Sequence, residues 1–151
     1  MPAKKKRPRI AISSSQSALR VPRKKLSKLI EFVAEREGVA LAAVDLAVVG
    51  PSEIAKMNRT YLRHPGPTDV LSFDLSEAGT PLISAQIVVC AELALRQARW
   101  RPHGPQRELM LYVVHGLLHL MGYEDQSVRG AVRMHAREEE LLDEFDKAKG
   151  R

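Results

Sequence analysis

Two histidines with the spacing of metal ligands stand in a long apolar stretch of the chain. His115 and His119 lie four residues apart between Val113 and Met121, and their neighbours are almost all aliphatic. On an α-helix this spacing corresponds to about 6 Å of rise and about 40° of rotation, so both imidazoles leave the same face. A helix that is apolar nearly all round is buried. Two neutral imidazoles on one stripe of such a helix favour a divalent transition metal, zinc above all.

The residues that follow this helix can supply a third ligand. Gly122 stands where a left-handed residue ends a helix, and the turn would carry Glu124 and Asp125 back towards the histidines. Either carboxylate would then complete a site of two histidines and one acid, which leaves a fourth position for water, as in a catalytic zinc site. The alternative is a pair of hydrogen-bonded core histidines. The apolar helix, the glycine and the acidic turn together favour the metal site.

The residue after the first histidine excludes one common class of zinc enzyme. Helical zinc proteases carry HExxH, in which the glutamate is the general base. Here that position is Gly116, so peptide hydrolysis by this route lacks its base. Glycine costs about 1 kcal/mol in a helix interior relative to alanine. We therefore expect a close approach of another segment at this position.

Two sequence blocks resemble one known family. HGLLHLMGYED, His115 to Asp125, is similar to the HGxLHLxGYDH signature of the YbeY-like rRNA-maturation endoribonucleases, which are single-domain bacterial metalloproteins. MNRTYLRHPGPTDVLSFDL, Met57 to Leu75, resembles the LNxxYR…TDVLSF block of the same family. The order and separation of the two blocks also agree with the family.

The resemblance implies an activity and partners. It implies a zinc-dependent endoribonuclease that binds one divalent ion and cleaves single-stranded RNA in ribosomal RNA maturation and ribosome quality control. Ribosomal RNA and the small ribosomal subunit would be its partners, and the oligomeric state stays open. Two alternatives remain. One is a metal-dependent hydrolase of another substrate, and the other is a ribosome-associated binding protein with a structural metal.

The resemblance also assigns roles to individual residues. Two metal-binding histidines of the family fall on His115 and His119, and the third falls on Asp125, whose carboxylate can still bind zinc. The functional arginine of the family falls on Leu62, with Arg63 directly after it, so Arg63 is the candidate to steady the charge that develops on the phosphate. The start of the TDVLSF block is expected to line the cleft beside the metal.

Composition predicts one soluble domain. The chain has 151 residues, of which 44% are hydrophobic and 28% charged, as in a globule with a single core. No apolar run approaches the roughly 20 residues of a membrane span. No signal-peptide core follows the basic N-terminus, which predicts a cytoplasmic protein without membrane contact. Cys90 is the only cysteine, so no internal disulfide is expected, and the net charge of +6 favours an anionic partner such as RNA.

The order of helical and extended patterns predicts an α+β fold with α/β-like alternation. Residues 1–9 are expected to form a basic flexible tail, and residues 10–151 a single metallo-endoribonuclease domain. Short apolar segments predict four strands in one sheet covered by helices, at residues 10–12, 44–49, 70–75 and 87–90. The family resemblance implies that this sheet is mixed.

Helical spacing and stop signals predict five helices. They run from Pro22 to Gly38, from a Ser52 cap to Arg63, from Ala91 to Trp100, from Pro105 through the histidines, and onward from a Ser127 cap. In the second helix the expected inward residues are Ile54, Met57 and Tyr61. In the last helix one face is expected to carry Val128, Val132, His135, Leu142 and Phe145.

Overall fold

The computed structural model describes residues 7–62 and 68–149, with the side chain of Lys149 left out. Within these residues four strands form one sheet in the order β1 (Arg9–Ser14), β2 (Leu41–Val49), β4 (Ile83–Cys90) and β3 (Val70–Asp74). Strands β1, β2 and β4 are parallel, whereas β3, at the edge, is antiparallel to β4. The predicted α+β class and mixed four-stranded sheet are therefore confirmed.

The central strands are apolar on both sides because helices cover both faces of the sheet. Val44, Leu46 and Val48 of β2 point into the larger core, together with Ile87 of β4. The alternate positions, among them Val49, Val88 and Cys90, enter a smaller core on the other face. This two-sided burial is typical of parallel strands. It also places Cys90 in the interior, as its apolar surroundings indicate.

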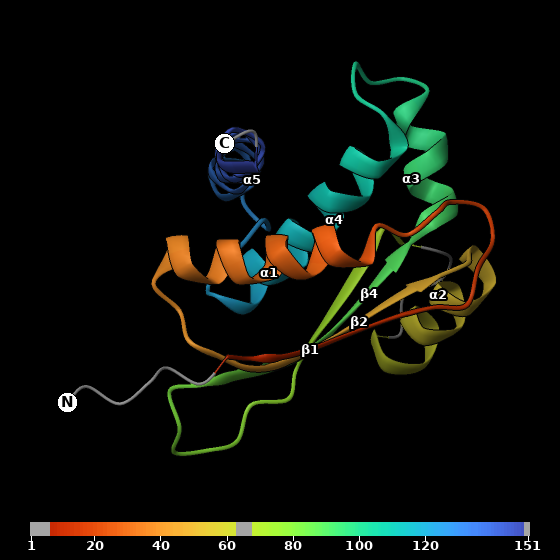
Figure 1. The fold of residues 1–151 in the computed structure, drawn as a ribbon. Helices are drawn as coiled ribbons and strands as arrows, with labels where there is room; N and C mark the ends of the chain where they lie inside the picture. The colour runs from red at the N-terminus through yellow and green to blue at the C-terminus, as the bar shows by residue number, and fades with distance from the viewer. Residues whose placement is uncertain (1–6, 63–67, 150–151) are drawn as a thin grey trace.

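The helices divide between the two faces of the sheet. Helices α1 (Arg23–Glu37) and α4 (Pro105–Leu120) cover the larger core, and α5 (Val128–Lys149) packs against both of them (Figure 1). Helix α2 (Pro51–Met57) covers the other face and continues as a π-helical turn, η1 (Asn58–Leu62), while α3 (Ala91–Ala98) follows β4 directly. None of the helices in the described part of the chain is long and apolar enough to cross a membrane.

Gly116 allows α4 to lie unusually close to the sheet. A Cβ atom at this position would lie 2.9 Å from Ser72 Oγ, 3.1 Å from Ile87 Cγ2 and 3.2 Å from Val70 Cγ2, closer than real Cβ contacts normally come. In addition, Ser72 Oγ donates a hydrogen bond of 3.2 Å to the carbonyl oxygen of Gly116. The expected close approach is therefore confirmed. It fixes the depth at which the two histidines of α4 stand beside β3.

Several predicted boundaries differ from those observed. Strands β1, β2 and β4 are longer than expected because polar and small residues at their ends also pair through the backbone, as Arg9 does with Ala43. The predicted cap of α2 was wrong. The helix begins at Pro51 with Gly50 in the capping position, and Ser52 makes no capping hydrogen bond. Tyr61 is 65% exposed because the π-helical turn rotates it away from the buried Ile54.

The prediction for α5 was half right. Ser127 caps this helix as expected, because its Oγ accepts a hydrogen bond of 2.9 Å from the backbone N–H of Gly130. Leu142 and Phe145 are buried, whereas Val128, Val132 and His135 are exposed. The helix meets the core only from Met134 onward, so no described residue buries the expected side of its first turns. The buried face is formed by Met134, Glu138, Leu141, Leu142 and Phe145.

Candidate metal centre and its pocket

The structure brings the two histidines and one acid of the following turn together. The Nε2 atom of His115 lies 3.4 Å from Asp125 Oδ2, and the Nε2 atom of His119 lies 3.2 Å from Asp125 Oδ1. One ligand atom of each of the three residues can be chosen so that all lie within 4.8 Å of one another. Both histidines are partly exposed, at 27% and 40% of their side-chain surface. The alternative of two histidines enclosed in the core is therefore not what the structure shows.

The types of the three side chains, more than their exact spacing, suit a tetrahedral metal ion. With metal–ligand bonds of about 2.0–2.1 Å, two ligand atoms of a tetrahedron lie about 3.3–3.4 Å apart. The separations of 3.4 Å and 3.2 Å end on different oxygens of Asp125, Oδ2 and Oδ1, and one ligand atom from each of the three residues lies within 4.8 Å of the other two, so the three side chains are gathered but are wider apart than around a bound ion. Two imidazoles and one carboxylate are also a donor set that zinc accepts. The residues present therefore fit a divalent transition metal.

Gly122 and Tyr123 turn the chain so that Asp125 faces the histidines. Gly122 has a φ of +104°, which favours glycine, and the N–H of Tyr123 donates a hydrogen bond of 3.0 Å back to the carbonyl of Leu118. The hydroxyl of Tyr123 donates a further hydrogen bond of 3.0 Å to Glu37 Oε2 at the end of α1. Of the two acids that the sequence left open, Asp125 meets the histidines. Glu124 instead accepts a hydrogen bond from Ser127 Oγ, at 3.0 Å.

Glu138, on the buried face of α5, holds His115 in a defined orientation. Its Oε2 atom lies 2.7 Å from His115 Nδ1, and only 9% of its side chain is exposed. When Nδ1 carries the proton and donates a hydrogen bond to Glu138, the lone pair of Nε2 points towards Asp125. A carboxylate behind a metal-binding histidine fixes its tautomer in this way and raises its basicity.

Sequence reasoning missed Glu138, although a signal was present. It stands four residues after Met134 and three before Leu141, so an acid lies on the apolar stripe of an otherwise amphipathic helix. Buried carboxylates are rare unless they are paired.

The charges around the site shift two pKa values. Burial alone would lower the pKa of His115, but the hydrogen bond and charge of Glu138, together with Asp69 and Asp125, raise it above its usual value. Burial raises the pKa of Asp69, and the neighbouring His115 offsets only part of this effect. Shifted pKa values in a cleft are typical of functional sites.

A pocket of about 480 Å³ opens in front of the three residues. Besides them, its wall includes Thr68 and Asp69 at the start of β3, as the family resemblance suggested, and Leu62 at the end of η1. The pocket is further lined by Val70, Leu71, Ser72, Asp74 and Leu120. Arg63, the arginine expected to act here, lies outside the described residues. A metal at the three ligands would therefore face a space that can hold a reactant.

Known proteins resemble this chain over most of its length. The profile of the family described as Endoribonuclease YbeY matches residues 11–146. A protein of that name from Bacillus velezensis is 36% identical over 131 residues, which cover 80% of this chain and 83% of the relative. Another, from Moorella thermoacetica, is 38% identical over 128 residues, covering 78% of this chain and 82% of the relative.

A solved structure shares the fold. The solution structure of TM1509 from Thermotoga maritima superposes with a TM-score of 0.58 at 28% identity, and the match covers 92% of this chain and 93% of that chain. The region matched by the family profile, residues 11–146, contains both histidines and Asp125, and the relatives and the solved structure each cover most of the chain. The chain belongs to the YbeY endoribonuclease family.

Proposed function

We propose that the protein is a zinc-dependent endoribonuclease that cleaves single-stranded RNA, with ribosomal RNA as its substrate during maturation and quality control of the small ribosomal subunit. The relatives described above bear the name endoribonuclease. The observation that carries the proposal is the convergence of His115, His119 and Asp125 on one wall of an open pocket. Structural zinc is enclosed by four protein ligands, whereas three ligands beside a pocket leave a position for a reactant.

His115, His119 and Asp125 would hold the metal, which polarises a phosphoryl oxygen or lowers the pKa of a water molecule. Glu138 would keep the Nε2 atom of His115 free to bind by accepting a hydrogen bond from Nδ1–H. The pocket volume of about 480 Å³ suits one nucleotide turned out of a base stack. Unpaired RNA supplies such a nucleotide at little cost, which supports a preference for single strands.

Arg63 is the proposed partner of the phosphate. The residues on either side of the undescribed segment, Leu62 and Thr68, both line the pocket. An arginine presents a planar fork of N–H donors that matches phosphate oxygens and stabilises the charge that grows during cleavage. The net charge of +6 adds a general attraction for a polyanion.

Peptide hydrolysis is disfavoured because residue 116 lies on the side of α4 that faces the sheet. A zinc protease of the HExxH type needs a glutamate there as its base. A side chain at Gly116 would instead meet Ser72, Ile87 and Val70 of the sheet. The position does not line the metal pocket, so a base placed there would not reach a bound substrate.

The test measures bound metal and RNA cleavage in parallel. The wild type, His119→Ala and Asp125→Ala are compared on a single-stranded precursor rRNA segment, an unrelated single strand of equal length and a duplex. We expect both variants to lose metal and cleavage while retaining their circular dichroism spectrum. Arg63→Ala is expected to retain metal and lose cleavage, with Arg59→Ala, exposed on η1, as the matched control.

Three results would contradict the proposal. If the metal-loaded wild type cleaves none of the RNAs, the protein is not this enzyme. If metal removal unfolds the chain, the ion has the structural role of a binding protein. If the duplex is cleaved as fast as the single strands, the preference for unpaired RNA is wrong.

A further inference from the structure

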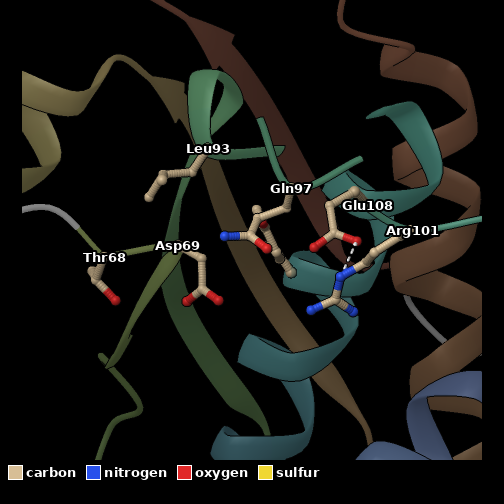
Figure 2. A pocket seen from close by; sticks show the side chains of 7 residues that line it. Thr68, Asp69, Leu93, Gln97, Arg101 and Glu108 are labelled. Carbon is tan, nitrogen blue, oxygen red and sulfur yellow. Dashed lines mark ion pairs between the residues drawn. The ribbon is translucent and has the colours of Figure 1, made fainter. Parts of the chain in front are cut away.

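A second pocket of about 320 Å³ lies beside the proposed metal pocket and shares part of its wall. Thr68 and Asp69 line both pockets. Figure 2 shows the second pocket between the start of β3, helix α3 with Leu93 and Gln97, and the start of α4 with Glu108. A chain bound at the first pocket can therefore reach the second through the shared wall.

Tyr112 brings a buried polar atom without a partner to this pocket. The residue is 6% exposed and lines the pocket, yet its hydroxyl makes no hydrogen bond of acceptable geometry to any described residue, the nearby Glu108 included. Burial, followed by the charge of Glu108, raises the pKa of this hydroxyl, which keeps it protonated and able to donate. An unpaired buried hydroxyl costs stability, and such groups are rare unless a ligand or water satisfies them.

The remaining polar groups of the pocket favour a neutral ligand with N–H groups. Glu108 is 1% exposed, and its Oε1 lies 2.6 Å from His103 Nε2. Figure 2 shows its ion pair with Arg101, whose Nε lies 3.6 Å from the same oxygen. Arg101, which also lines the pocket, pairs with Glu108, so among the described lining residues the carboxylate without an ion pair is that of Asp69, which disfavours a phosphate here. The side-chain amide of Gln97 can donate and accept, and Leu93 adds an apolar surface. A flat ring with hydrogen-bonding edges satisfies this set of groups.

We propose that this second pocket is a nucleobase subsite, which binds an unpaired base next to the phosphodiester held at the metal pocket. The proposal rests on the proposed RNA substrate and deepens it. Carboxylates accept hydrogen bonds from base amino groups. Guanine offers adjacent N1–H and N2–H₂ donors to one carboxylate, while its O6 atom can accept from Tyr112 or Gln97. Guanine is therefore the base expected to bind most tightly.

The first experiment measures binding without cleavage. Guanosine, adenosine, cytidine and uridine are titrated separately into the metal-loaded full chain and followed by NMR chemical shifts. Guanosine is expected to bind in a saturable way, at least several-fold more tightly than the other three. Gln97→Leu should weaken this binding about tenfold, because it removes a pair of hydrogen bonds. The matched control Gln106→Leu, which lines neither pocket, should not weaken it.

Tyr112→Phe separates ligand binding from a structural role. If the hydroxyl serves only a ligand, its removal weakens guanosine binding while the melting temperature of the free protein stays the same or rises. A marked fall of the melting temperature would show that the hydroxyl supports the fold, and would overturn its assignment to the subsite.

The second experiment distinguishes the subsite from the nuclease activity. Single-stranded RNAs with one guanine moved stepwise along a uridine chain are cleaved by the wild type and by Gln97→Leu. A cleavage position fixed relative to the guanine, and lost in Gln97→Leu, supports the subsite. Guanosine binding without any RNA cleavage supports the subsite and refutes the nuclease. Cleavage without guanosine binding, and with the same pattern in both proteins, overturns the subsite and leaves the nuclease intact.

Discussion

Replacing Glu138 should weaken metal binding without touching a ligand. Its bond to His115 Nδ1 is 2.7 Å long and largely shielded from water, and charge-assisted bonds of this kind contribute about 1.5–3 kcal/mol. Loss of such a carboxylate typically lowers metal affinity roughly 10- to 100-fold. Glu138→Gln keeps an acceptor and loses the charge, so we expect about tenfold, at the lower end of this range. Glu138→Leu also leaves the Nδ1–H without a partner, so we expect about 100-fold, at its upper end.

The assay is a competition between the protein and a chromogenic chelator for Zn²⁺ near neutral pH. The control is Glu144→Gln on the same helix, which makes the same charge change but pairs with Arg36 at 3.5 Å, away from the site. Circular dichroism checks that each variant is folded. If Glu138→Leu binds Zn²⁺ as tightly as the control, then His115 does not depend on this carboxylate, and the ligand arrangement proposed above is wrong.

Three further predictions concern His115, Gly116 and Trp100. Because the pKa of His115 is raised in the folded chain, its protonation stabilises the metal-free protein below the unfolded pKa of about 6.5, and this contribution is lost as the pH rises through the folded value. The rise in melting temperature on adding Zn²⁺ should therefore grow with pH over this window, and a rise independent of pH would contradict it. Gly116→Ala should destabilise the fold by about 1–2 kcal/mol in urea, because overpacking against Ser72 outweighs the gain in helix propensity, and an unchanged midpoint would refute this. An exposed indole can stack on an RNA base, so if Trp100, 86% exposed next to Arg101, does this, Trp100→Ala should weaken binding of a non-cleavable single strand roughly 5- to 100-fold in fluorescence anisotropy, and equal affinity would exclude the contact.

The sequence correctly predicted the features that depend only on residues close together in the chain, such as the ends of helices. Gly38, with a φ of +68°, ends α1, and Ser127 caps α5, because each acts on backbone groups within a few residues. The spacing of His115 and His119 placed both on one face for the same reason. The pairing order of the sheet depends on contacts far apart in the sequence, so helical and strand periodicity could not supply it, and the family resemblance was needed.

The features that sequence reasoning missed depend on tertiary packing. Tyr61 has the spacing of an inward residue, but the helix widens into a π-helical turn before it and moves it outward. Val128 and Val132 were expected on one face with Leu142 and Phe145, yet among the described residues no element covers that part of α5. The role of Glu138 depends on α5 crossing behind α4. Helical spacing in the sequence shows which residues share a face of a helix, but it does not show which other element packs against that face.

The bond from Tyr123 to Glu37 links the turn that carries Asp125 to the far end of the N-terminal helix. Arg137 donates to the other oxygen of the same carboxylate, at 2.7 Å, so α1, the turn and α5 meet at one acid. A truncated protein that begins after α1 would still contain all three proposed ligands, but it would lack the anchor that sets their separation. Because α1 also supplies buried core residues, a substitution at Glu37 would remove this anchor more selectively than a truncation, and its effect on metal affinity would show that the turn is held from α1.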